Sequence, residues 1–289
     1  MARTLTQLPN FFLIGAHKAG TTSISVLLAA HPQIAVARPK EPGFFARDRV
    51  YAKGRGWYAA CFDHAGESRA IGDCSTIYSQ CGVFPQTAAR IAALTPAARI
   101  IYVGRHPLER VASAWVQYRA QGRPDVPADF SAAVRSVPQL LDATLYWKQL
   151  SRYRGRFSDQ QILALTFDDF VADPAGVMRR VYRFLGVDPD FVPEAASWAH
   201  NVSAGQREPT AILMVLRKLR PRDGPFRLPV GAITRIRRWT TRPLRYPAFD
   251  AGTREWVLER VWSDNAAFLR YAGARSDLWS RPVSARGAS

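Results

Sequence analysis

A loop near the N-terminus carries residues that suit phosphate chemistry. Residues 15–22 read GAHKAGTT and lie between a short apolar run, Phe11–Gly15, and a segment with helical spacing, Thr21–Ala30. A loop between a strand and the start of a helix presents unpaired backbone N–H groups and the positive end of the helix dipole, which together bind anions. The sequence therefore predicts an anion site around Lys18.

The position of Lys18 distinguishes between two kinds of phosphate loop. The Walker A loop of nucleoside triphosphatases has its lysine directly after the second glycine, followed by serine or threonine. Here Lys18 precedes Gly20 by two residues, and two threonines follow that glycine. A P-loop kinase acting on a small molecule is therefore the weaker alternative, since it also needs an acidic ligand for Mg²⁺.

A second phosphate element is expected in the middle of the chain. Residues 105–113 read RHPLERVAS and follow a β-branched run, Arg99–Val103. The planar guanidinium of Arg105 suits a terminal phosphate dianion, and Ser113, two helical turns further on, adds a hydroxyl donor.

These motifs resemble those of the sulfotransferases that use 3′-phosphoadenosine 5′-phosphosulfate (PAPS). The GxxKxGTT form is similar to the family's 5′-phosphosulfate loop, and residues 105–113 are similar to its 3′-phosphate element. Residues 39–45 (PKEPGFF), 53–58 (KGRGWY) and 245–250 (RYPAFD) resemble the heparan-sulfate, or carbohydrate, type of this family. The resemblance extends from about residue 11 to about residue 279.

The resemblance implies the reaction and its partners. A sulfuryl group would pass from PAPS to a hydroxyl or amine of an acceptor, expected to be a carbohydrate or glycolipid, and adenosine 3′,5′-bisphosphate would be released. No metal is expected. The donor is expected to bind to Lys18, Ala19, Gly20, Thr21, Thr22, Arg105, Ser113, Arg242 and Arg245. The acceptor is expected to bind to Lys40, Asp73, Ser75, Tyr78 and Trp57.

Two catalytic roles follow from the resemblance. Lys18 is expected to act on the oxygen that bridges phosphate and sulfuryl group, because its ammonium can follow charge onto the leaving phosphate. Glu41 is expected to be the general base, which takes the proton of the acceptor. A histidine serves as base in the phenol and steroid branch of the family, so four histidines remain alternatives: His17, His64, His106 and His200.

Two departures from the family pattern concern these sites. The family's Glu-Lys-Thr segment reads Asp73-Cys74-Ser75 here, so a lysine frequent in the glycan enzymes is absent. Leu244 stands where an arginine is common in the late basic loop, which leaves Arg242 and Arg245 as its phosphate ligands.

The chain carries a formal net charge of +17, and eleven Lys or Arg lie between residues 207 and 245, against Glu208 and Asp223. Such a segment attracts an anionic glycan, the donor, a membrane surface or nucleic acid. A basic nucleic-acid-binding protein is the second alternative, although we expect no nucleic-acid partner. The preference for Arg over Lys is also what a GC-rich genome produces.

The elements that must position these residues follow from hydrophobic periodicity. Strands are expected at residues 11–15, 70–74, 99–103 and 161–165. Helices are expected at 21–30, 84–94, 108–119, 139–153, 174–185 and 253–271, with Asp173 as an N-cap and Gly186 at a C-terminus. Their alternation predicts an α/β fold, a central parallel sheet flanked by helices. The resemblance implies the P-loop nucleotide-kinase-like variant of that fold.

The whole chain, 1–289, is expected to form a single domain. Its core would cover about 10–200, a basic lid-like segment about 205–246, and a C-terminal helix about 252–272. Three cysteines without a CxxC pair, no signal-peptide pattern and no long apolar run predict a cytoplasmic protein without a transmembrane segment, for which peripheral membrane contact stays open.

Overall fold

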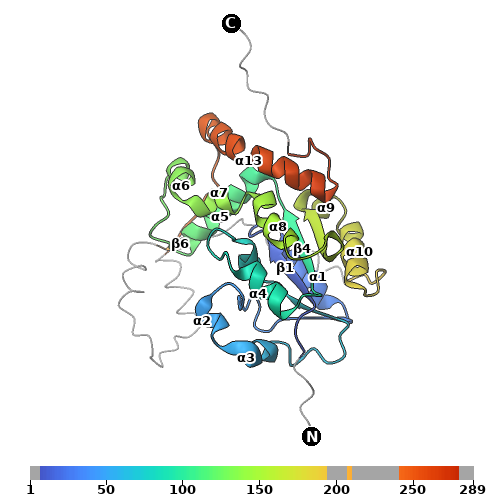
Figure 1. Ribbon diagram of the computed structural model, residues 1–289. Coiled ribbons are helices and arrows are strands. Elements are labelled where there is room, and N and C mark those ends of the chain that lie inside the picture. Colours follow the sequence, from blue (N-terminus) through green and yellow to red (C-terminus); the bar gives the residue numbers. More distant parts are fainter. Residues whose placement is uncertain (1–6, 194–206, 210–240, 280–289) are drawn as a thin grey trace.

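The computed structural model describes residues 7–193, 207–209 and 241–279, and its centre is a parallel β-sheet (Figure 1). The strands are β1 (Phe11–Gly15), β2 (Ile34–Val36), β3 (Ala70–Asp73), β4 (Arg99–Gly104) and β5 (Ile162–Thr166). They pair in the order β2-β3-β1-β4-β5, and every pairing is parallel. The predicted α/β class is confirmed.

Helices precede and follow these strands along the chain. The longer ones are α1 (Thr21–Ala30), α4 (Thr87–Leu94), α5 (Pro107–Ala120), α8 (Tyr146–Arg154), α10 (Pro174–Leu185) and α13 (Ala251–Ala272). The shorter ones are α2 (Asp48–Tyr51), α3 (Gly54–Ala60), α6 (Phe130–Ser136), α7 (Pro138–Asp142) and α9 (Phe167–Ala172), with 3₁₀ turns η1 (Thr76–Ser79) and η2 (Asp159–Gln161). A separate antiparallel pair joins β6 (Arg207–Pro209) to β7 (Thr241–Pro243).

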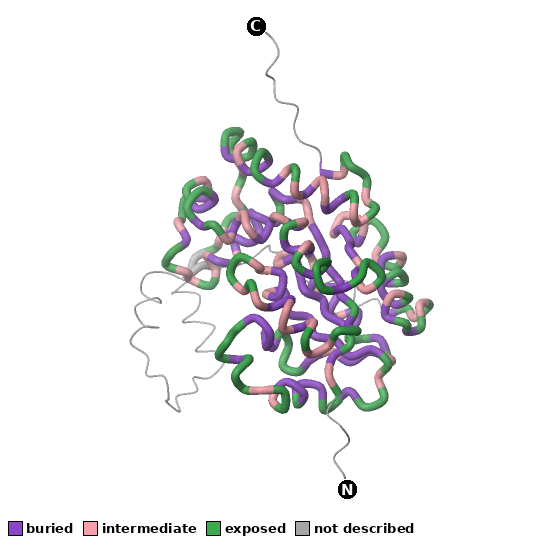
Figure 2. Tube along the Cα trace, in the orientation of Figure 1, coloured by how far each residue is buried: buried purple, intermediate pink, exposed green. Residues whose placement is uncertain are grey.

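The central strands are buried on both faces. Every residue of β1 is buried, as is β4 after Arg99, and Figure 2 shows the buried trace concentrated in the middle of the molecule. Strands covered by helices on both sides lack the polar alternation of a half-exposed sheet, which is why the FFLIG and IIYV runs were readable as strands.

Within the described residues, no helix combines the length and apolarity needed to cross a bilayer.

Helix α10 shows how local sequence fixes an element. The Asp173 carboxylate accepts a hydrogen bond from the backbone N–H of Gly176 at 2.8 Å, and Gly186 ends the helix with φ of 73°. An N-cap of this kind stabilises a helix by about 1 kcal/mol. Both predicted ends of α10 are confirmed.

The single helix predicted at residues 139–153 is wrong, because the chain forms two helices there, α7 and α8. The carbonyl of Leu140 accepts hydrogen bonds from the Thr144 hydroxyl at 2.9 Å and from Arg110 Nη1 at 2.7 Å. The backbone N–H of Thr144 bonds instead to the carbonyl of Leu141. A long-range arginine therefore ends α7 where periodicity alone would continue it.

The sheet order brings three loops to one edge. Strand β1 lies between β3 and β4, so the segments that follow these strands meet at their carboxyl ends. Open α/β sheets bind ligands at this edge, where neighbouring strands connect in opposite directions. The loop 15–22, the residues after Asp73 and the residue Arg105 all lie there.

Candidate active site

The loop 15–22 curls into the start of helix α1. Gly20, the residue before the helix, has φ of 78°, and a Cβ atom there would lie 2.3 Å from the ring of Phe167, so glycine is required. Gly20 offers no side chain to cap α1, and the first turn of α1 contains no acidic residue. The positive end of the helix is thus left to an anion, with Thr21 and Thr22 in its first turn.

Lys18 lies in this loop in a strained conformation. Its φ is 72°, a value that non-glycine residues adopt rarely and at a cost of about 1–3 kcal/mol. Its side chain is half-buried, while the following Ala19 is fully buried. Burial lowers the pKa of Lys18, and the charges of Arg105 and Arg110 lower it further. The ammonium therefore releases its proton more readily than an ordinary lysine.

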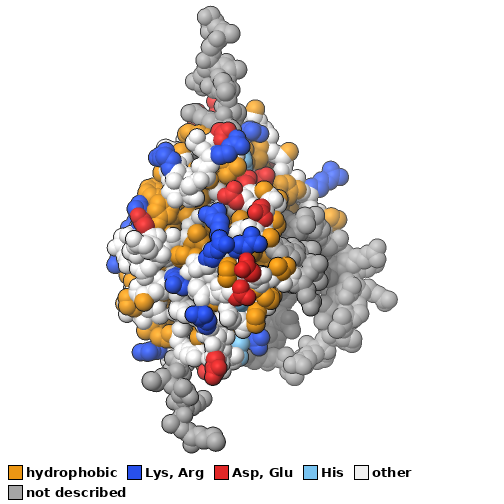
Figure 3. Space-filling model, turned by 90° about the vertical axis from the view of Figure 1, so that its right-hand side faces the viewer, with side chains coloured by type: hydrophobic (Ala, Val, Ile, Leu, Met, Phe, Trp, Pro, Cys, Tyr) orange, Lys and Arg blue, Asp and Glu red, His pale blue; other side chains and the backbone are white. Residues whose placement is uncertain are grey.

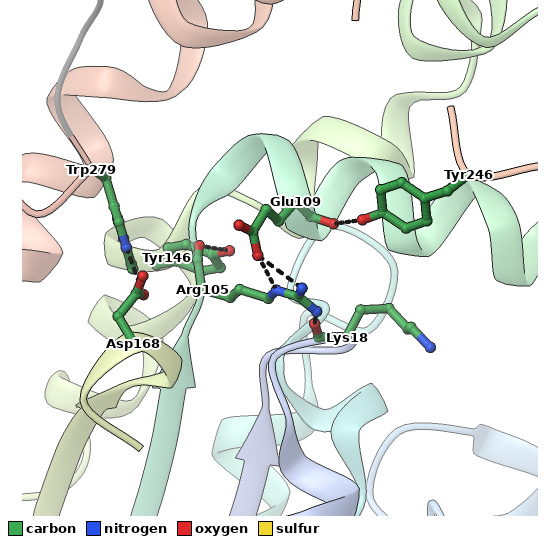
Figure 4. Close-up of polar contacts among 7 residues, drawn as sticks. All are labelled: Lys18, Arg105, Glu109, Tyr146, Asp168, Tyr246 and Trp279. Carbon is green, nitrogen blue, oxygen red and sulfur yellow. Dashed lines mark hydrogen bonds and ion pairs between the residues drawn. The ribbon is translucent and has the colours of Figure 1, made fainter. Parts of the chain in front are cut away.

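Arg105 connects β4 with the loop (Figure 4). Its Nη1 donates to the carbonyl of Lys18 at 3.3 Å, and its Nε and Nη2 donate to Glu109 Oε2 at 3.0 and 2.8 Å. The Tyr146 hydroxyl holds the Arg105 carbonyl at 2.7 Å. The side chain of Arg105 is 21% exposed and that of Glu109 56%, so an arriving anion can reach the pair.

The late basic loop approaches the same place. The Tyr246 hydroxyl donates to the carbonyl of Glu109 at 3.1 Å, which brings the exposed Arg245 to this part of the chain. Arg242 lies in β7, opposite Glu208 of β6. Their contacts with the donor stay predictions. Most of the basic segment 205–246 lies outside the described residues.

Arg110 is a buried residue behind the loop whose contacts sequence reasoning missed. It is fully buried, and its Nε donates to the carbonyl of His17 at 3.1 Å while Nη1 donates to Leu140 and Thr144. Its Nη2 is buried with no partner among the described residues. The guanidinium therefore places positive charge behind the loop and fixes the loop's backbone. Its only signal in the sequence was its place in the RHPLERVAS motif.

Ser113 lies on α5 and is 1% exposed. Its contact with a 3′-phosphate stays a prediction.

Glu41 also has a strained backbone. Its φ is 54°, and Gly43, two residues on, has φ of 62°. The side chain of Glu41 reaches solvent, yet enough protein surrounds the carboxyl for burial to raise its pKa. The charges of Lys40 and Arg47 and a hydrogen bond from Thr76 oppose that rise. Among the described non-glycine residues, positive φ occurs at Lys18 and Glu41, the two predicted catalytic residues.

Beside Glu41 lies a buried carboxylate, Asp73. Its Oδ2 accepts from the hydroxyls of Tyr58 at 2.8 Å and Tyr78 at 2.7 Å, and its Oδ1 accepts from Ser75 at 2.6 Å. Burial raises the pKa of Asp73 to about 6, although the three hydrogen bonds oppose this. Asp73 and Ser75 are fully buried, and Tyr78 is 1% exposed. Their contacts with the acceptor stay predictions. In the structure Ser75 and Tyr78 donate hydrogen bonds to Asp73.

The remaining predicted acceptor residues reach solvent. Lys40 is exposed, and Trp57 is half-buried under the ammonium of Lys53, 4.3 Å from its ring centre. Phe44 stacks on Tyr58, with the two ring centres 4.3 Å apart. Trp57 is therefore able to offer part of its ring to a ligand.

The alternative bases are less suitable. Burial, followed by the charges of Arg110 and Lys18, lowers the pKa of His17 to about 3, and burial lowers that of His106. His64 is exposed and bonds to the carbonyl of Val36. His200 lies outside the described residues. A base with a pKa near 3 takes protons poorly at neutral pH, so Glu41 is the better candidate.

Segment 73–79 joins the two catalytic loops. A Cβ on Gly15 would lie 2.3 Å from Ser79 Oγ, so the start of the donor loop touches this segment. At the other end, the Ser75 hydroxyl accepts from the N–H of Gly43 at 3.2 Å. The loops of Lys18 and Glu41 therefore rest on a common support.

On the face in Figure 3, Lys and Arg side chains lie interspersed with Asp and Glu. That face does not form the unbroken basic surface that tracks a nucleic-acid backbone.

Comparisons with known proteins show which proteins this chain resembles. Heparan sulfate glucosamine 3-O-sulfotransferase 3A1 of Mus musculus is 31% identical over 247 residues, which cover 76% of this chain and 61% of that protein. The human bifunctional heparan sulfate N-deacetylase/N-sulfotransferase 2 is 28% identical over 205 residues, covering 65% and 23%. The chain thus spans about three-fifths of the length of the first relative and about a quarter of the second.

A solved sulfotransferase from Alicyclobacillus acidocaldarius shares the fold, with a TM-score of 0.68 at 23% identity over 95% of this chain and 100% of that one. Residues 8–201, well over half of the chain, match the sulfotransferase domain family. The protein belongs to the sulfotransferase family.

Proposed function

We propose that this protein transfers the sulfuryl group of PAPS to a hydroxyl or amine of a carbohydrate or glycolipid. One observation carries the proposal. The start of α1 has no side-chain cap and lies beside Lys18 and Arg105, and the strained Glu41 rests on the same segment, 73–79, as this loop. The first part suits a phosphosulfate and the second suits proton removal. A kinase would need the Walker A spacing, which the loop lacks.

The residues of the donor side divide by the group that each would hold. Gly20, Thr21 and Thr22, at the start of α1, would bind the 5′-phosphate through backbone and hydroxyl donors. Arg105 would bind the 3′-phosphate, with Ser113, Arg242 and Arg245 as further ligands. PAPS supplies the activated sulfuryl group, and the protein's task is to place it and to stabilise the charge that develops.

Lys18 and Glu41 would handle that charge and the proton. The ammonium of Lys18 stabilises negative charge on the leaving phosphate oxygen, and its lowered pKa makes it a readier proton donor. Glu41 takes the proton of the acceptor, and its raised pKa makes it a stronger base than a solvated carboxylate. The pKa of each side chain is thus shifted by surrounding residues that do not themselves react.

The acceptor class rests on the acceptor side and on the relatives. Lys40 is exposed beside Glu41, and Trp57 offers a partly exposed ring, a combination that suits a sugar carrying negative charge. The curated relatives above are named as heparan sulfate enzymes. We therefore propose an anionic glycan as acceptor, with a glycolipid headgroup as the variant that would bring the protein to a membrane surface.

Binding of adenosine 3′,5′-bisphosphate tests the donor half. At a hundredfold excess over Kd, a ligand specific for the folded state stabilises it by about 2.7 kcal/mol, so the melting temperature should rise by several degrees. ATP with Mg²⁺ serves as the control that the kinase alternative needs. A response to ATP alone would overturn the proposal.

Transfer from ³⁵S-labelled PAPS tests the acceptor half. Heparan sulfate and a neutral glycolipid, supplied separately, should show which class receives label. Donor binding without label on any glycan or glycolipid would remove the acceptor class and leave the donor assignment standing.

A further inference from the structure

A buried carboxylate beside the proposed base has no role in the chemistry described so far. Asp73 is fully buried at the end of β3, where a charged carboxylate is costly unless it is well hydrogen-bonded. Its partners in the described chain are three hydroxyl groups, those of Tyr58, Tyr78 and Ser75. All three donate to it, so the site requires an acceptor-only group.

The direction of the Ser75 hydrogen bonds matters most. A serine hydroxyl has one proton, and Ser75 gives it to Asp73 Oδ1 at 2.6 Å. Its lone pairs then face the backbone N–H of Gly43, which donates to it at 3.2 Å. If Asp73 became a donor, the Ser75 hydroxyl would have to turn, and the Gly43 N–H would lose its acceptor.

Gly43 is the natural anchor for Glu41. Glu41 has positive φ, a conformation that a non-glycine residue keeps only where its surroundings enforce it, and Gly43, two residues on, adopts positive φ freely. The neighbour of Ser75, Thr76, acts on the Glu41 carboxyl, whose pKa its side chain lowers. The geometric hold on the loop is the bond from the Gly43 N–H to the Ser75 hydroxyl.

Resting on the sulfotransferase function proposed above, we infer that Asp73 and Ser75 are positioning residues for Glu41: the buried carboxylate orients the Ser75 hydroxyl, which anchors Gly43 and holds the base in its strained loop. Both side chains are fully buried, and Ser75 links Asp73 to the backbone of the loop. This role differs from the acceptor contact expected from sequence, because it works through the loop rather than through a bound sugar.

The matched pair Ser75→Ala and Ser75→Thr tests the role. Alanine leaves the Gly43 N–H without its acceptor, so kcat should fall by about tenfold or more, while the Kd for adenosine 3′,5′-bisphosphate changes by less than about twofold. Threonine keeps the hydroxyl and should restore most of kcat. Tyr182→Phe is the control, because it removes a buried hydrogen bond to the Leu27 carbonyl, at 3.2 Å, which lies outside segment 73–79. It should lower the melting temperature and leave kcat unchanged.

A wild-type kcat in Ser75→Ala would overturn the inference, and so would equal losses in kcat and donor binding. If Ser75→Ala does not fold, Asp73→Asn takes its place, since its amide cannot accept all three hydroxyl protons; a wild-type kcat in that variant would also overturn the inference.

Hydrogen exchange provides a readout that does not depend on turnover. Ser75→Ala should speed amide exchange in residues 39–46, and Tyr182→Phe should not. Unchanged exchange in Ser75→Ala would overturn the positioning role. Inactivity of the wild-type enzyme together with faster exchange in the variant would count against the proposed function alone.

Discussion

The donor side and the acceptor side of this site are built in different ways. The proposed donor loop is one continuous stretch at a helix start, and Arg105 and Arg110 hold its backbone through the carbonyls of Lys18 and His17. The acceptor side assembles Glu41, Tyr58 and the segment 73–78 from separate parts of the chain. Backbone N–H groups of one loop are sufficient to bind a phosphate. A general base must also be oriented toward its proton, and this orientation requires side chains from several elements.

Burial acts on both sides with opposite signs. It lowers the pKa of Lys18, because it disfavours the ammonium, and raises the pKa of Glu41, because it disfavours the carboxylate. Both groups therefore move toward neutrality, which suits one for giving a proton and the other for taking one. The contrast leads to variants that should separate donor binding from proton transfer.

The largest effect is expected from Glu41→Gln. Removal of the base should lower kcat by ~10²–10⁴, because general-base assistance is typically of that size. The Kd for adenosine 3′,5′-bisphosphate, measured by calorimetry, should stay unchanged, since Glu41 lies on the acceptor side. Glu67→Gln, at another exposed glutamate, is the control. Near wild-type turnover in Glu41→Gln would move the base to a histidine.

Lys18→Ala should affect the other side. The loss of a preorganised charge at the leaving oxygen should lower kcat by about 10²–10³, and binding of the bisphosphate should weaken as well. The KM for the acceptor should change little. Lys148→Ala is the control for the loss of one positive charge, because Lys148 of α8 forms an ion pair with Asp142 of α7. A change confined to acceptor KM would break the division into two sides.

Glu109→Gln should strengthen donor binding. The Glu109 carboxylate accepts hydrogen bonds from two nitrogens of Arg105, and it would compete with a 3′-phosphate for them. An exposed ion pair is worth about 0–1 kcal/mol, so affinity for the bisphosphate should rise by up to about fivefold, and less at high salt. Arg105→Ala should have the opposite effect. Weaker binding in Glu109→Gln would show that Glu109 orients Arg105 instead.

The same contrast explains what could be predicted from the sequence. Lys18 and Arg105 belong to contiguous motifs, β1 and α1 have local apolar patterns, and α10 has local caps, so these were readable without a structure. The break between α7 and α8 was not, because it depends on Arg110, thirty residues away from Leu140.

The support of Glu41 was hidden for a related reason. Asp73 and Ser75 were expected at the sheet edge, but their mutual hydrogen bonds and the bond to Gly43 exist only in three dimensions. A carboxylate at a strand end reads as a ligand for the cleft, and only its complete burial shows that it faces inward. Positive φ at a glutamate likewise has no signature in sequence.

The smallest effect, and the finest test of the acceptor side, is expected from Thr76→Val. The Thr76 hydroxyl lowers the pKa of Glu41, so its removal should raise that pKa. A base works only when deprotonated, and the acid limb of the kcat profile should therefore move to higher pH, while the plateau above it is kept. Thr87→Val, at a buried threonine bonded to the Phe84 carbonyl, is the control.

If the acid limb stays in place, that limb does not report the titration of Glu41. A shift toward lower pH would contradict the role given to Thr76. Because Thr76 is adjacent to Ser75, a shift in pH without a loss of plateau would also show that the two hydroxyls divide their work, one setting the proton affinity of the base and the other its position.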